Sequence, residues 1–204
     1  MSLTIVVAKY KEDISWIDTL NGDYNIKIYD KEHDYPNVGR EAETYLRFIL
    51  ENYDNMPEYV AFVQGNPFDH FDKDKLFNHL KNYTSCENMT FLTNHLIETM
   101  DFSKKNWNMA MYESTKALFH TELPSEITFS QGAQFIVCRK NIIQRPKWFY
   151  QKIYNVLFRE NPLCFGINHS KCLVCPWTLE RLWFYIFTPS IQHREFEETD
   201  LFLK

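Results

Sequence analysis

Residues 59–71, YVAFVQGNPFDHF, place polar side chains directly after an apolar run with the composition of a buried strand. These polar residues are Gln64, Asn66, Asp69 and His70. In open α/β sheets the ligand binds outside the carboxyl ends of the strands, where loops bring polar groups together above an apolar base. A carboxylate and an imidazole suit Mn²⁺-type or Zn²⁺-type ions, so Asp69 and His70 are candidate metal ligands. The alternative is a structural loop in which Asn66 makes an Asx-turn and Asp69 caps the next helix.

A second candidate site begins at Asn37, where the sequence NVGREA opens a segment with a strong helical pattern. The free amide groups and partial positive charge of a helix N-terminus attract anions. Arg40 is therefore a candidate for holding a phosphate or a carboxylate, with Asn37 and Gly39 shaping the turn. The alternative interpretation is a helix cap followed by a surface pair of Arg40 and Glu41.

Glu180 and Arg181 lie in a very apolar segment, TLERLWFYIF, which has helical spacing. A carboxylate in such a helix must be paired or held at the edge of a cleft, because burying it alone is costly. Glu180 is either a general base with a raised pKa or a structural partner of Arg181.

The cysteine-rich segment near the C-terminus has the spacing C-x4-H-x2-C-x2-C, formed by Cys164, His169, Cys172 and Cys175. A structural zinc site needs four ligands of these types. Because the segment has one CxxC pair where robust zinc ribbons have two, we expect free thiols and no stoichiometric zinc.

The elements that must position these residues follow from the hydrophobic periodicity. Strands are predicted at residues 3–8, 24–29, 59–64 and 133–138, a short helix between the first two, and longer helices at residues 40–53, 72–82, 146–158 and 177–187. Residues 84–124 are polar and irregular, and we expect their long loops to form part of an acceptor cleft. The alternation of strands and helices favours an α/β fold with a mainly parallel central sheet flanked by helices.

Composition limits the class of protein. The chain has 204 residues, 45% of them hydrophobic, which predicts one compact globular domain. The formal charge of −5, without a basic stripe, argues against nucleic-acid binding. No apolar run approaches the ~20 residues of a membrane span, and the N-terminus lacks a signal pattern, so we expect a cytoplasmic protein. The sequence also lacks GxGxxG and GxxxxGK[ST], the two common glycine-rich phosphate loops.

Five blocks, in this order, resemble an uncharacterised domain family: VVAKYKEDISWI, NVGREAETYLRFILENYDN, VAFVQGNPFDH, ITFSQGAQFIVCRKNII and LERLWFYIF. They cover nearly the whole chain. More loosely, the chain resembles the GT-A type of nucleotide-sugar glycosyltransferase, in which a nucleotide-binding α/β half ends in a metal-binding acidic loop. The resemblance implies one glycosyltransferase-like domain over residues 1–204, with a nucleotide-binding half at 1–82 and an acceptor-side half at 83–204.

The resemblance implies a transfer of a sugar from a nucleotide-diphospho-sugar to an acceptor hydroxyl on a glycan or another molecule, with a divalent metal, Mn or Mg. The residues expected to bind the donor are Ala8, Lys9, Tyr10, Asn37, Arg40, Glu41, Gln64, Asn66, Gln131, Gly132 and Gln134. Asp69 and His70 would hold the metal, and Glu180, together with Asp69, would be catalytic. The loop departs from the family pattern, since it has no D-x-D sequence. The alternative is a non-catalytic carbohydrate- or protein-binding module on the same fold.

Overall fold

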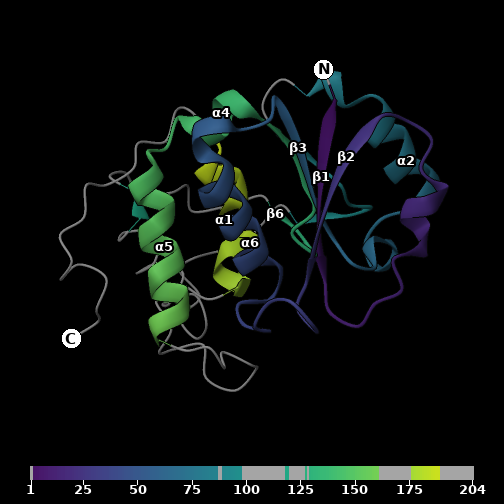
Figure 1. Ribbon diagram of the computed structural model, residues 1–204. Coiled ribbons are helices and arrows are strands. Elements are labelled where there is room, and N and C mark those ends of the chain that lie inside the picture. The colour runs from purple at the N-terminus through teal and green to yellow at the C-terminus, as the bar shows by residue number, and fades with distance from the viewer. Residues whose placement is uncertain are drawn as a thin grey trace.

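The structure, a computed structural model, describes residues 2–86, 89–97, 118–119, 127, 129–160 and 176–188. A five-stranded sheet forms its centre, with the strand order β2-β1-β3-β7-β4 (Figure 1). The strands are β1 (Leu3–Lys9), β2 (Tyr24–Asp30), β3 (Tyr59–Gln64), β4 (Met89–Phe91) and β7 (Phe135–Cys138). A separate two-stranded sheet pairs β5 (Leu96–Ile97) with β6 (Phe129–Ser130).

The first three strands run parallel, and the register places Ala8 beside Tyr29 on one side and Gln64 on the other. β7 runs antiparallel to both of its neighbours, β3 and β4. The expectation of a mainly parallel α/β sheet flanked by helices is therefore confirmed. The strand β4 is a new element in a segment that we expected to be irregular.

Helices cover both faces of the sheet (Figure 1). One face carries α1 (Arg40–Asn52), α5 (Lys147–Glu160) and α6 (Pro176–Ile186), while α4 (Arg139–Ile143) follows β7 directly. The other face carries α2 (Lys73–Lys81) and the short helix η1 (Ser15–Thr19). Further 3-10 turns are η2 (Tyr53–Asn55), η3 (Pro67–Asp69) and η4 (Tyr83–Ser85). The helices predicted from periodicity are thus confirmed, with ends that differ by a few residues.

The strand side chains alternate between two cores. Val6 and Phe62 face the core beneath α1 and α6, while Val7 and Val63 face the core beneath η1 and α2. Strands buried on both faces need continuous apolar sequence, which explains the composition of β1 and β3. This rigid base leaves the ends of the strands as the place where polar groups can gather.

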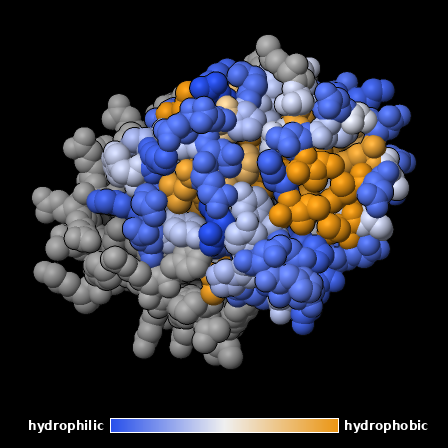
Figure 2. All heavy atoms as spheres, viewed as in Figure 1, coloured by the Kyte–Doolittle hydropathy of each residue, from blue (hydrophilic) through white to orange (hydrophobic). Residues whose placement is uncertain are grey.

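The edge strand β2 is less buried than its neighbours. Figure 2 shows apolar surface gathered over this edge, where Ile28 is 44% exposed. Lys27 is also exposed on the same strand. A lysine on an edge strand opposes pairing with a second sheet, because its charge would have to be desolvated.

Among the described residues, no helix is long and apolar enough to cross a membrane.

Candidate functional site at the carboxyl ends of β1 and β3

A cavity of about 340 Å³ lies where β1 and β3 end. This volume is near the lower end of the range for small-molecule pockets. Its lining residues are Ala8, Lys9, Tyr10, Glu12, Lys31, Asn37, Arg40, Glu41, Gln64, Asn66, Asp69 and His70. Because β2 and β3 flank β1 on opposite sides, the cavity lies at the point where the strand order reverses.

The floor of the cavity depends on a close approach at Gly65. Its backbone amide donates to Ala8 O at 2.8 Å, and its carbonyl accepts from Trp16 Nε1 at 2.8 Å. A Cβ on Gly65 would lie 2.6 Å from Glu12 Oε2, a carboxylate that also accepts from the backbone amide of Tyr10. A backbone hydrogen bond therefore joins β1 to the residue after β3, at the point where the polar side chains begin.

The strand-end loop has the Asx-turn that the structural alternative predicts, but not the predicted helix cap. Asn66 Oδ1 accepts from Phe68 N at 3.4 Å, and Asn66 Nδ2 donates to Asp69 Oδ1 at 2.9 Å. The cap of α2 is Asp72, whose Oδ1 accepts from Lys75 N at 3.1 Å. Asp69 is exposed and lines the cavity with His70. The idea that Asp69 caps the next helix is wrong.

Gln134 supports this loop from behind. Its side chain is fully buried, its Oε1 accepts from Gln64 N at 3.2 Å, and its Nε2 donates to Pro67 O at 3.1 Å. Both ends of the amide are thus used by the loop backbone. Gln134 lies outside the cavity lining, so the structure places it as a support for the loop.

The turn before β7 lies against His70. Gly132 has φ 83°, and a Cβ there would meet His70 Cδ2 at 2.4 Å. Glu180 Oε1 accepts from Gly132 N at 2.9 Å, so α6 holds this turn in place. Gln131 is exposed, and Gln131, Gly132 and Glu180 do not belong to the cavity lining. Glu180 and Gly132 therefore affect the cavity only indirectly. Glu180 holds the turn at Gly132, and this turn lies against His70, which lines the cavity.

The N-terminus of α1 forms the opposite wall. Gly39 and Arg40 have positive φ values of 63° and 49°. The ammonium group of Lys31, which is buried, donates to Val38 O at 2.6 Å and to Arg40 O, and it pairs with Glu43 Oε2 at 3.0 Å. Arg40 itself is exposed. Its guanidinium lies 5.0 Å from the ring centre of Trp177 on α6, a cation–π contact, and its N–H groups make no hydrogen bond with the residues that the structure describes.

Glu41 is the carboxyl on this wall. Burial raises its pKa to about 7, and the negative charge of Glu180 acts in the same direction. Arg40, Lys31 and a hydrogen bond from its own backbone amide act in the opposite direction but are outweighed. A carboxyl with this pKa exchanges protons at neutral pH.

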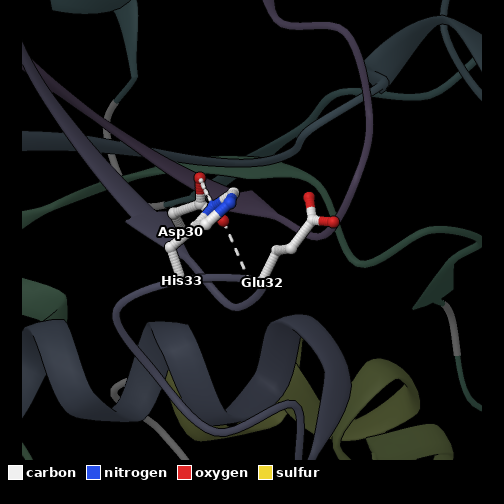
Figure 3. A group of neighbouring side chains, drawn as sticks. All are labelled: Asp30, Glu32 and His33. Atoms are coloured by element: carbon white, nitrogen blue, oxygen red, sulfur yellow. Dashed lines mark hydrogen bonds and ion pairs between the residues drawn. The ribbon is translucent and has the colours of Figure 1, made fainter.

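Asp30, Glu32 and His33 bring their ligand atoms within 4.8 Å of one another (Figure 3). Asp30 Oδ2 already accepts from Lys9 Nζ and lies 3.2 Å from His33 Nδ1, while Oδ1 accepts from Glu32 N at 2.9 Å. These contacts lower the pKa of Asp30 to about 2, and the hydrogen bond from Lys9 has the largest effect. Asp30 therefore acts as the anchor of Lys9.

The candidate metal ligands are brought to one cavity, but without a full set of protein ligands. Asp69 and His70 do not belong to a group of three close ligand side chains within the described part of the chain. The proposed zinc ligands Cys164, His169, Cys172 and Cys175 lie outside the described residues. Cys138 is buried, and its thiol donates to Asn141 Oδ1 at 2.9 Å.

Two residues of the cavity, Glu12 and Lys31, were not among the predicted site residues. Glu12 reaches the cavity because Lys11 adopts a positive φ of 70° and turns the chain back on itself. Lys31 directly follows β2. Because β2 was predicted to run parallel to β1, the residue after β2 could have been expected at the same edge of the sheet as the end of β1.

Comparison with known proteins gives a family. No curated protein and no solved structure matches the chain significantly. The sequence profile described as "Protein of unknown function (DUF3431)" matches residues 5–98 and 78–199. Since these matches together cover most of the chain, it belongs to this DUF3431 family.

Proposed function

We propose that the protein is a glycosyltransferase that uses a nucleotide-diphospho-sugar donor. The observation that carries the proposal is the cavity at the strand-order reversal, which combines an available guanidinium on Arg40 with the carboxylate of Asp69 and the imidazole of His70. Open α/β sheets bind nucleotides at such points. All twelve lining residues belong to the half of the chain, 1–82, that the resemblance assigns to nucleotide binding.

The chemistry requires a stabilised leaving group. In glycosyl transfer the bond between the anomeric carbon and the diphosphate breaks, and negative charge grows on the diphosphate. Arg40 at the N-terminus of the 13-residue helix α1 would supply positive charge there. Asp69 and His70 would hold a Mn or Mg ion together with diphosphate oxygens, since such ions often bind with only one or two carboxylates from the protein. The GT-A likeness belongs to this proposal and is supported by the mostly parallel sheet.

Donor binding tests the proposal directly. Calorimetry and thermal shift against a panel of UDP- and GDP-sugars, with and without Mn²⁺, should identify a donor that raises the melting temperature. Binding should weaken about tenfold or more in Arg40→Met, because a charge-assisted hydrogen bond to phosphate is lost. Arg139→Met, a change at an exposed arginine outside the cavity, is the matched control. Failure of every nucleotide-sugar to bind would refute the proposal.

The role of Asp69 has its own test. Asp69→Asn should abolish the Mn²⁺-dependent part of donor binding with little change in melting temperature, since Asp69 is exposed. Asp74→Asn removes the same charge from an exposed position on α2, outside the cavity, and should change neither. Unchanged Mn²⁺ dependence in Asp69→Asn would remove Asp69 from the mechanism.

The second candidate is a binding module for glycans without catalysis. It is favoured by the exposed ring of Tyr10, 40% accessible at the cavity, because aromatic rings stack on sugar faces. The same panel separates the two functions. Binding of free glycans, with no release of UDP or GDP from any donor, would support the module.

A further inference from the structure

Glu41 and Glu180 are two carboxylates on facing helices, α1 and α6, and their surroundings give them different tasks. Glu41 lines the cavity, whereas Glu180 does not. The two groups repel each other electrostatically. Which of them can exchange a proton with a bound molecule depends on the hydrogen bonds that each already makes.

Glu180 is committed to the protein. Its Oε1 accepts from Gly132 N at 2.9 Å, and its Oε2 lies 3.7 Å from a guanidinium nitrogen of Arg181. Its side chain is only 14% exposed. These contacts suit a side chain that fixes the turn against His70.

Glu41 differs because it lines the cavity, where a bound molecule can reach it. One helical turn further along α1, the hydroxyl of Tyr45 is fully buried and has no hydrogen-bond partner among the described residues. The charges of Glu41 and Glu180 both raise the pKa of Tyr45, after the larger effect of burial, so the hydroxyl lies within electrostatic reach of both carboxyl groups. Tyr45 does not belong to the cavity lining, so a bound molecule can reach Glu41 and not this hydroxyl.

The other charged groups around Glu41 come from several elements. Arg40 neighbours it on α1, Lys31 lies in the connection from β2, and Glu180 faces it from α6. Across the cavity are Lys9, Glu12, Asp69 and His70. Glu41 lines the cavity, and its pKa of about 7 lies near neutral pH.

We propose that Glu41 is the catalytic residue that removes the proton from the acceptor hydroxyl, and that Glu180 is a positioning residue for the turn at Gly132. This assignment rests on the proposed function and replaces the sequence-based assignment of Glu180 as the base. The acceptor oxygen forms a bond to the anomeric carbon while its proton passes to the Glu41 carboxylate. The bond from that carbon to the diphosphate breaks, and its electron pair leaves with the diphosphate. Glu41 then returns the proton to solvent.

The test compares three glutamate-to-glutamine changes by the release of UDP or GDP from the donor, with water or a panel of alcohols as acceptors. Glu41→Gln should bind the donor within a few fold of the wild type but lose roughly a hundredfold or more in turnover. Glu180→Gln should lose less than tenfold, because its amide oxygen can still accept from Gly132 N. Glu58→Gln is the matched control, since Glu58 is exposed and precedes β3 at the opposite end of the sheet.

The pH profile provides a readout that a structural role would not change. Turnover should rise with pH through about 7, where Glu41 loses its proton. In Glu180→Gln this midpoint should move to lower pH, because a neighbouring negative charge has been removed. Glu180→Leu, which cannot accept from Gly132 N, should in addition raise the KM for the donor.

Two outcomes overturn the assignment: turnover within tenfold of the wild type in Glu41→Gln, or a hundredfold loss in Glu180→Gln. If Glu41→Gln does not fold, the ¹³C signal of the Glu41 carboxyl in the wild type carries the test, identified by comparison with Glu41→Asp. Its titration midpoint should equal that of turnover, and different midpoints would overturn the assignment. Absence of donor binding to the wild type would instead refute the proposed function itself.

Discussion

Asp30 and Glu41 are carboxyl groups on either side of the same loop, between β2 and α1, yet their pKa values move in opposite directions. Asp30 accepts hydrogen bonds from Lys9 and from its own loop, and its pKa falls to about 2. Burial raises the pKa of Glu41 to about 7, and the charge of Glu180 acts in the same direction. Asp30 is thereby fixed as an ion that anchors Lys9.

The largest cause of the difference is burial, which raises the pKa of Glu41, while the hydrogen bond from Lys9 lowers that of Asp30. The positive charges of the wall contribute as well. Lys9 forms an ion pair with Asp30. Lys31 donates to two backbone carbonyls and forms an ion pair with Glu43. Glu41 therefore lies near Lys31 without forming an ion pair with it, and the charge of Arg40 does not outweigh the effect of burial.

Lys31→Met should have the largest effect on stability, because it removes a buried cation that binds Glu43 and two backbone carbonyls at the start of α1. Glu43 Oε2 would lose its ion pair, while Oε1 would keep Arg47 at 2.7 Å and the hydroxyl of Tyr154 at 3.2 Å. Two backbone carbonyls would also lose their donor. Breaking a buried pair of this kind costs about 3 kcal/mol. Urea denaturation would measure the loss, with Lys27→Met on the exposed side of β2 as control. A loss below about 1 kcal/mol would contradict this role.

Glu41→Gln should change how stability depends on pH. Because the pKa of Glu41 in the folded protein, about 7, lies above the usual 4.5, the protonated form favours folding. Its contribution is complete below pH 4.5 and is lost as pH rises through 7. The wild type should therefore lose up to about 3 kcal/mol relative to Glu41→Gln between pH 4.5 and pH 8. Parallel pH profiles for the two proteins, measured by urea denaturation, would show that Glu41 has an ordinary pKa.

Asp30→Asn should have the smallest effect and the opposite sign with pH. The lowered pKa of Asp30 means that its contribution is present above pH 3.8 and is lost as pH falls through about 2. Because this pair lies near the surface, solvent screening limits the effect to about 1 kcal/mol or less. Thermal melting of both proteins between pH 2 and pH 5 measures it. A steeper loss for the variant than for the wild type would reverse the expected sign.

Much of the fold follows from periodicity. The runs that became β1 and β3 are apolar throughout, and α1 has a regular apolar face, so local pattern was sufficient. The short strand β4 was missed because three residues contain too little pattern. The antiparallel direction of β7 was also not predicted, since alternation of side chains carries no information on strand direction.

The site was predictable where it follows strand ends and not where it depends on tertiary contacts. The residues after β1 and β3 and those before α1 meet in one cavity, as the strand-end argument expects. Gln134 was expected near the donor but is buried behind the loop, because both ends of its amide bond to backbone groups distant in sequence. Similarly, only the fold reveals that Glu180 accepts from Gly132 N.

The central claim is that the cavity between β1, β3 and α1 binds the diphosphate portion of a nucleotide-sugar. The most direct measurement is a titration of ¹⁵N-labelled protein with UDP and with GDP, followed by amide chemical shifts. We predict saturable shifts confined to residues 8–12, 37–41 and 64–70, and their loss in Arg40→Met but not in Arg139→Met. No saturable shifts with either nucleotide, or shifts centred on α2 or the β2 edge, would contradict the account.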